Sequence, residues 1–262
     1  MDPQIEVGVG MDVTERFSDR VEQYVAHRPT YPAALVDRLV ARAGLGEGST
    51  IADVGSGTGI FAALLLARGL RVFAIEPNRA MREAAERLLG ADGRFVSVDG
   101  SAESTGLEDA SVDALCAAQA FHWFDPARAR AEFSRILRPG GVVALIWNDR
   151  KVDSTPFLAA YDALLRTHGT DYVQVNHRNV DAGRLRSFFG AAGYTEDVFA
   201  NQQRFDWEGL YGRAMSSSYV PAEGSPGYRP FIDGLREVFD RHANAGVVTF
   251  EYDARLYLGT IA

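Results

Sequence analysis

The chain has 262 residues, a length that one large α/β domain can account for. Its composition, 47% apolar and 24% charged, is typical of globular proteins and excludes a collagen-like or wholly disordered chain. A net charge of −8 argues against nonspecific binding to nucleic acid, which needs a basic surface, although a few arginines could still bind a small anionic substrate. The single cysteine excludes an internal disulfide, and no apolar run is as long as a membrane span. We therefore expect a cytoplasmic protein that acts on neither nucleic acid nor membrane.

The first part of the chain is expected to hold a leader and two helices. Residues 1–11 show no apolar periodicity and predict a disordered leader. An apolar residue at every fourth position predicts an amphipathic helix over residues 13–25. This helix should end near Arg28, because Pro29 disfavours helical geometry in the residue before it. Pro32 then suits the first turn of the next helix.

From residue 50 onward, short apolar segments alternate with helical ones. Helix boundaries stand out at Asn78 and Asp125, which can cap the helices that follow them, and at Gly69 and Gly90, which can end them. This alternation predicts a parallel sheet covered by helices on both faces. The five strands expected here are residues 50–55, 71–76, 94–99, 111–119 and 141–148.

Beyond the fifth strand the pattern changes. Helical spacing occurs over residues 154–168 and 185–189, and a sixth strand is expected near residues 196–206. Two more helical stretches flank a Pro- and Gly-rich loop at 221–230. Residues 248–258 alternate between apolar and polar side chains, which favours an antiparallel last strand. The fold class is thus an open, twisted, seven-stranded α/β sheet, and the long connections predict a helical lid over it.

The sharpest motif is D-V-G-S-G-T-G at residues 53–59, between the first strand and a helix. Its glycines, Gly55, Gly57 and Gly59, allow a tight turn and a close approach of a ligand to the backbone. A dinucleotide fingerprint would need a glycine where Ile60 stands. This mismatch disfavours an NAD(P)-dependent oxidoreductase, which remains the alternative enzyme.

Glu76 ends the second strand, 21 residues after Gly55. A carboxylate at this place can accept hydrogen bonds from both hydroxyls of a ribose. A glutamate at a strand end is by itself more often a solvated loop charge. Together with the glycine loop, it favours the binding of a nucleoside cofactor.

Several segments together resemble the class I S-adenosylmethionine-dependent methyltransferases over roughly residues 12–148. They are I-A-D-V-G-S-G-T-G, A-I-E-P, G-S-A-E-S, A-A-Q-A-F-H-W-F-D and I-L-R-P-G-G. The pattern F-x(6)-Y-x(3)-R-P-x-Y-P, with F-H-W-F, resembles more narrowly the small-molecule, type 11 or trans-aconitate methyltransferase-like subgroup. The resemblance implies a Rossmann-like fold, S-adenosyl-L-methionine as methyl donor and S-adenosyl-L-homocysteine as product.

The same resemblance implies cofactor contacts at the matching positions. These are Asp53 and the three glycines at the methionine moiety, Glu76 at the ribose, Pro77 and Met81 flanking the adenine, Ser101 and Ala102 at its edge, and Ala118 and Gln119 near the sulfonium.

Other candidates lie in the first helix and after the fourth strand. Arg28 can pair with the cofactor carboxylate through its two-pronged guanidinium, or else interact with carbonyls at a helix end. Tyr24, with Phe17 and Tyr31, can cover cofactor or substrate, or else belong to the core. His122 is the candidate acid–base catalyst, unless its H-W-F segment only packs the next helix. No histidine spacing suggests a metal site.

The function expected is methyl transfer to a small molecule by in-line displacement, with a general base needed only for a protonated nucleophile. We expect one methyltransferase domain, residues 12–262, in a monomer or homodimer. It divides into a cofactor half (12–148), lid insertions with the sixth strand (149–246) and the terminal strand (247–262). Phe157, Tyr161 and the loop from Tyr219 to Pro230 are expected to cover the acceptor, unless the two aromatics form only the packing stripe of their helix. A protein that binds S-adenosylmethionine without catalysis is the non-enzyme alternative.

Overall fold

The computed structural model describes residues 27–170, 172 and 182–261. The expected leader over residues 1–11 and the helix over residues 13–25 therefore lie outside the described residues, and so do Phe17 and Tyr24.

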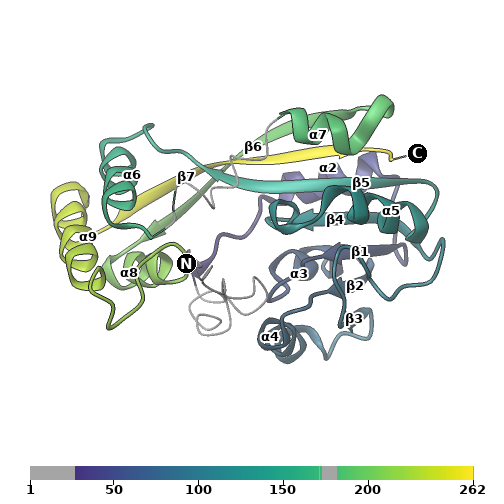
Figure 1. Ribbon diagram of the computed structural model, residues 1–262, viewed down its shortest axis with the longest axis horizontal. Coiled ribbons are helices and arrows are strands. Elements are labelled where there is room, and N and C mark those ends of the chain that lie inside the picture. Colours follow the sequence, from purple (N-terminus) through teal and green to yellow (C-terminus); the bar gives the residue numbers. More distant parts are fainter. Residues whose placement is uncertain (1–26, 171, 173–181, 262) are drawn as a thin grey trace, which may run out of the picture.

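One seven-stranded sheet forms the centre of the fold, in the order β3-β2-β1-β4-β5-β7-β6 (Figure 1). The strands from β1 to β5 pair in parallel, whereas β7 lies between β5 and β6 and is antiparallel to both. The expected α/β sheet with an antiparallel last strand is thus confirmed. The strands are β1 (Thr50–Val54), β2 (Arg71–Ile75), β3 (Phe95–Val98), β4 (Val112–Ala118), β5 (Leu137–Arg150), β6 (Tyr194–Phe205) and β7 (Val248–Gly259).

Side-chain burial explains why these segments form strands. In β1, four consecutive residues, Ile51 to Val54, are buried, as expected for a strand with helices on both faces. In β7 every second residue from Val248 to Leu258 is buried and the residues between them are half-buried. This alternation is the one that the sequence predicts for residues 248–258. β5 is longer than expected, because pairing with β4 begins at Leu137 and pairing with β7 extends to Arg150.

Helices cover both faces of the sheet. On one face, α2 and α3 form an apolar core with β1, β4 and β7, and on the other face α5 and α7 form a second core. The helices are α2 (Ala33–Arg42), α3 (Ile60–Leu66), α4 (Arg79–Leu89), α5 (Pro126–Ile136), α6 (Pro156–His168), α7 (Ala182–Phe189), α8 (Trp207–Met215) and α9 (Tyr228–His242), with a 3-10 turn η2 (Phe121–Trp123). None of the helices in the described part is long and apolar enough to cross a membrane.

The capping residues act as the sequence predicts. The Asn78 side chain accepts a hydrogen bond from the Met81 amide, and Asp125 accepts hydrogen bonds from the first turn of α5. The predicted loop at 221–230 is shorter than expected, since α9 begins at Tyr228. Pro230 therefore lies in the first helical turn, where no amide hydrogen is needed.

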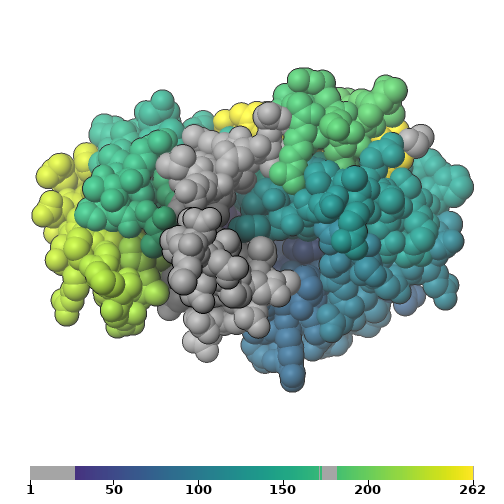
Figure 2. All heavy atoms as spheres, in the orientation of Figure 1, coloured from purple at the N-terminus to yellow at the C-terminus, as the bar shows by residue number. Residues whose placement is uncertain are grey.

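A third apolar core joins α6, α8 and α9 to the ends of β6 and β7. Figures 1 and 2 show these helices as a separate mass at one end of the molecule, opposite the end formed by α5 and α7. Phe157 and Tyr161 of α6 lie inside this core, with ring centroids 5.3 and 4.9 Å from that of Phe250. Their predicted contact with the acceptor is wrong, because the packing of the three helices buries both rings away from the cavity described below.

Candidate active site

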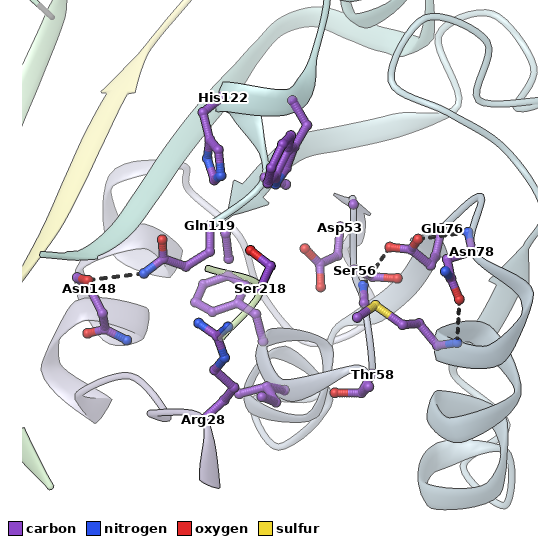
Figure 3. A pocket seen from close by; sticks show the side chains of 18 of the residues that line it. Arg28, Asp53, Ser56, Thr58, Glu76, Asn78, Gln119, His122, Asn148 and Ser218 are labelled. Atoms are coloured by element: carbon purple, nitrogen blue, oxygen red, sulfur yellow. Dashed lines mark hydrogen bonds between the residues drawn. The ribbon is translucent and has the colours of Figure 1, made fainter. Parts of the chain in front are cut away.

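A cavity of about 350 Å³ opens where the parallel strands end. Ligands of open α/β sheets bind at this edge. In Figure 3, Glu76 lies at one end of the cavity and Asn148 at the other, with Asp53 and Gln119 between them. Their order along the cavity is that of the strands β2, β1, β4 and β5 in the sheet.

The three glycines of the loop have different roles. All have positive φ, at 70° for Gly55, 56° for Gly57 and 84° for Gly59. A Cβ atom at Gly55 would lie 2.5 Å from the Cβ of Ala120, and one at Gly59 would lie 2.7 Å from a methyl group of Leu89. Both glycines therefore allow close packing within the protein.

Only Gly57 has open space on its side-chain face. A Cβ atom there would meet nothing nearer than the sulfur of Met81 at 3.7 Å, and the residue lines the cavity. A ligand can therefore approach this part of the backbone closely. Gly59 does not line the cavity, so its predicted contact with the cofactor is not found. It lies at the start of α3 and packs on α4.

Glu76 connects the glycine loop to the segment after β2. Its Oε2 accepts a hydrogen bond from the Gly57 amide at 2.9 Å, and its Oε1 accepts one from the Asn78 amide at 2.8 Å (Figure 3). Burial raises the pKa of the Glu76 carboxyl, while these two hydrogen bonds and Arg82 lower it by less. Each carboxylate oxygen can accept a second hydrogen bond, so both remain suited to ribose hydroxyls.

Asp53 is fully buried at the end of β1 and lines the cavity. Its Oδ1 accepts a weak hydrogen bond from the Cys116 thiol at 3.5 Å, and its Oδ2 has no partner within the described part of the chain. Burial raises the pKa of Asp53 to about 7, and the nearby Glu76 raises it further, while the Cys116 hydrogen bond lowers it. A buried carboxylate without a charged partner favours the binding of a ligand that carries a cationic group.

The four residues predicted to surround the adenine do line one part of the cavity together. Met81 and Ala102 are buried there, whereas Ser101 is half-buried. The Ser101 hydroxyl accepts a hydrogen bond from the Glu103 amide, and its backbone pairs with Ser104. The remaining residue, Pro77, follows Glu76 directly and also lines the cavity.

Ala118 and Gln119 line the cavity at the end of β4. Gln119 has a φ of 58°, which is strained for a residue other than glycine. Its amide donates to the Ile146 carbonyl at 2.8 Å, and its side chain donates to the Asn148 carbonyl at 3.1 Å. Two bonds to β5 thus hold Gln119 in this conformation at the cavity wall.

His122 lies in η2 and also lines the cavity. The sequence analysis left open that the H-W-F segment only packs against the next helix. The neighbours of His122 do pack in this way, because the Phe124 ring contacts Phe133 of α5 and Phe121 is fully buried. In Figure 3, His122 and Arg28 point into the cavity from opposite sides. His122 is therefore placed to contact a ligand.

Arg28 lines the cavity and also binds a carbonyl at a helix end, while its pairing with the cofactor carboxylate stays a prediction. Its guanidinium lines the cavity, and its Nη2 donates to the Ser216 carbonyl at 2.8 Å. Ser216 is the residue that ends α8, so Arg28 does bind a helix-terminal carbonyl, but that of another helix. Tyr31 lines the cavity beside it, with its ring 5.1 Å from that of Phe61.

One wall of the cavity was missed by the sequence analysis, apart from Tyr219 at the start of the loop expected to cover the acceptor. We call it the arginine–tyrosine wall; it consists of Arg150, Tyr172, Arg213, Tyr219 and Tyr252. Arg150 and Tyr252 are register partners on β5 and β7, and Arg213 comes from α8. The sequence did contain a signal for Arg213, which lies beside Leu210 and Ala214 on the apolar face of a helix. Because the chain has 26 arginines, this one position did not stand out.

The electrostatics of this wall are strongly positive. Burial by itself raises the pKa of the Tyr219 phenol, but the guanidinium groups of Arg213, Arg150 and Arg28 lower it by more, so its pKa lies below the ordinary value. Across the described residues, no group of three or more His, Cys, Asp and Glu side chains could hold a metal ion.

Comparisons with known proteins agree with this geometry. Residues 52–145 match a protein family described as a methyltransferase domain. An uncharacterized methyltransferase of Mycobacterium tuberculosis is 41% identical over 139 residues, which are 53% of this chain and 54% of that protein. The chain thus matches about half the length of this relative. An uncharacterized methyltransferase of Schizosaccharomyces pombe is 27% identical over 242 residues, or 89% of this chain and 92% of that protein.

Solved structures extend the likeness to the whole fold. A protein of Anaeromyxobacter dehalogenans described as a type II methyltransferase has a TM-score of 0.70 and 27% identity, over 90% of this chain and 99% of that one. A phosphoethanolamine N-methyltransferase of Haemonchus contortus, solved with S-adenosyl-L-methionine, shares the fold with a TM-score of 0.57 and 14% identity, over 97% of this chain and 60% of that one. The narrower resemblance to trans-aconitate methyltransferases stays a prediction. The chain is therefore similar to the methyltransferases: its residues 52–145 match the methyltransferase-domain family, and its fold matches that of a solved methyltransferase structure over 90% of its length.

Proposed function

We propose that this protein binds S-adenosyl-L-methionine along the β2–β1–β4 part of the cavity and transfers its methyl group to a small-molecule acceptor. The observation that carries the proposal is the buried Asp53 carboxylate with an unpartnered oxygen, beside the open face of Gly57. A cofactor with a cationic sulfonium and an α-ammonium group suits both features, because it offers positive charge to Asp53 and a slender chain to Gly57.

The other parts of the cofactor find matching groups in the same cavity. Glu76 can accept hydrogen bonds from the ribose hydroxyls, and Met81 and Ala102 supply apolar contact for the adenine. Arg28 can pair with the cofactor carboxylate. The residues present therefore fit the whole cofactor, from its base to its amino-acid end.

The protein would contribute mainly alignment and exclusion of water. When bound, the cofactor supplies an electrophilic methyl group on a sulfonium that is already a good leaving group, so the acceptor must chiefly be held in line. Gln119 is fixed by β5 at the wall between the cofactor part and the arginine–tyrosine wall. His122 can take a proton from an acceptor whose nucleophilic atom is still protonated.

Calorimetric titration with S-adenosyl-L-homocysteine tests this proposal, and Gly57→Val is the decisive variant. A branched side chain at Gly57 fills the open face, so binding should be lost. Gly44→Val is the matched control, because Gly44 has a similar φ of 62° and open space around it. Both variants carry the same backbone strain, and only Gly57→Val should lose the ligand. Unchanged binding by Gly57→Val would refute the placement of the cofactor.

Two further measurements separate the alternatives. Binding of NAD(P) in place of S-adenosyl-L-homocysteine would favour the oxidoreductase that the Ile60 position argues against. A panel of small acceptors with detection of S-adenosyl-L-homocysteine distinguishes an enzyme from a protein that only binds the cofactor.

A further inference from the structure

We infer that the arginine–tyrosine wall is a carboxylate-binding subsite centred on Arg213, and hence that the methyl acceptor carries a carboxylate group. The inference rests on the proposed function, since it concerns the substrate of the same cavity. It concerns a different part of the cavity from the cofactor, on the side of β5 and β7.

Among the described residues, Arg213 is a buried cation without an anionic partner. Its side chain belongs to α8 and only 6% of the residue is exposed. Its Nη1 donates to the Ser217 hydroxyl at 3.0 Å and to the Ser216 hydroxyl at 3.4 Å, and the Tyr252 phenol lies beside it. Its Nε has no partner, and no carboxylate in the described part of the chain pairs with it. Burying a charge among neutral oxygens is unfavourable, so a ligand that supplies the missing negative charge would be strongly favoured.

Arg150 is held in a different way. Its Nη2 donates to Asp162 at 3.3 Å and to the Tyr172 hydroxyl at 2.8 Å. Asp162 also accepts a hydrogen bond from Arg166 at 2.6 Å, so one carboxylate serves two guanidinium groups. Arg166 is more than half exposed and its charge is solvated, which leaves Arg150 largely balanced by Asp162. Arg150 therefore supports the wall, and Arg213 supplies its uncompensated charge.

The charge balance selects the type of anion. The wall has about one positive charge to neutralise, which matches a carboxylate better than a phosphate dianion. A planar carboxylate also fits the two-pronged geometry of a guanidinium and can accept a hydrogen bond from the Tyr219 phenol. The positive potential that lowers the pKa of Tyr219 is consistent with this assignment.

Arg28 and Arg213 bind different atoms of the segment that ends α8. Arg28 binds the Ser216 carbonyl, whereas Arg213 binds the Ser216 and Ser217 hydroxyls. In the arrangement proposed here, Arg28 lies at the carboxylate of the cofactor and Arg213 at the carboxylate of the acceptor. A change at Arg213 should consequently affect acceptor binding and leave cofactor binding nearly unchanged.

The test uses the protein saturated with S-adenosyl-L-homocysteine and a panel of small mono- and dicarboxylic acids, each paired with its uncharged amide. Phenylacetate, phenylacetamide and phenyl phosphate form one such set. By calorimetry we expect at least one acid to bind and its amide to bind at least about tenfold more weakly. The phosphate analogue should bind no more tightly than the acid. Arg213→Met should weaken the acid by at least about tenfold and change the affinity for S-adenosyl-L-homocysteine by less than about threefold.

Two controls distinguish binding from structure. Arg229→Met removes the same charge from an exposed position on α9 and should change nothing. Arg213→Met should not lower the melting temperature, because it removes an unpaired buried charge, and Arg213→Lys should restore part of the acid binding if Arg213→Met folds poorly.

Several outcomes would overturn the inference: no acid binds, the amide binds as well as its acid, the phosphate binds more tightly, or Arg213→Met retains acid binding. Failure of the wild-type protein to bind S-adenosyl-L-homocysteine would instead overturn the proposed function itself.

Discussion

Replacement of Asp53 by asparagine should change how the stability of the protein depends on pH. Burial raises the pKa of Asp53 from an ordinary value of 3.8 to about 7. Between these two values the folded chain retains a proton that the unfolded chain has released. The free energy of unfolding therefore falls as the pH rises from about 4 to about 7, and the lost stability is not recovered above that range. Asparagine has no such proton, so the variant lacks this part of the pH dependence.

The magnitude follows from the difference between the two pKa values. Each tenfold change in proton affinity corresponds to about 1.4 kcal/mol, so ionised Asp53 destabilises the fold by about 4 kcal/mol in total. About 3 kcal/mol of this effect falls between about pH 5 and pH 8. For a domain of this size, that difference corresponds to a change in melting temperature of about 6–12 °C.

Urea unfolding of the wild type and Asp53→Asn at the two pH values measures the effect. All other titrating groups are shared, so the stability of the variant minus that of the wild type should increase by about 3 kcal/mol from about pH 5 to about pH 8. Asp233→Asn, at an exposed position on α9, is the control and should show no such increase. A stability difference for Asp53→Asn that does not depend on pH would refute the assignment of Asp53 as a buried carboxyl without a charged partner.

Three further predictions concern ligand binding, packing and catalysis. Glu76→Ala should weaken S-adenosyl-L-homocysteine by about tenfold or more in calorimetry, because hydrogen bonds to charged groups contribute about 1.5–3 kcal/mol each; an unchanged Kd would place the ribose elsewhere. Phe157→Ala should lower the free energy of unfolding by about 3–5 kcal/mol while the folded enzyme retains its acceptor KM, since the ring lies in the third core; a changed KM at unchanged stability would contradict that position. His122→Gln should lower kcat by at least about tenfold for acceptors with a protonated nucleophile and leave carboxylate acceptors nearly unaffected; equal kcat values for both would exclude a proton transfer by this residue.

The sequence by itself determined those features that depend on neighbouring residues. The alternation over residues 248–258 predicted β7 correctly, because a strand buried on one face needs an apolar side chain at every second position. Asn78 and Asp125 predicted two helix starts, since a cap bonds to amides only two or three residues away. The glycine motif and Glu76 predicted one end of the cavity, because both follow parallel strands whose carboxyl ends share an edge of the sheet.

The tertiary structure alone decided which of several similar residues face the cavity. Gly57 and Gly59 both have positive φ, but only the packing of α3 against α4 directs Gly59 into the protein. Helical spacing showed that Phe157 is buried, without showing whether it meets the acceptor or Phe250.

Arg213 depends most on contacts between distant parts of the chain. Its sequence neighbours show an arginine on an apolar helix face, whereas its lack of an anionic partner among the described residues follows from how α8 meets β7 and the cavity. Periodicity in a sequence tells which face of a helix or strand is buried. The partner of a buried charge is fixed only when segments far apart in the chain pack together, because electrostatic and packing energies depend on distances in space rather than along the sequence.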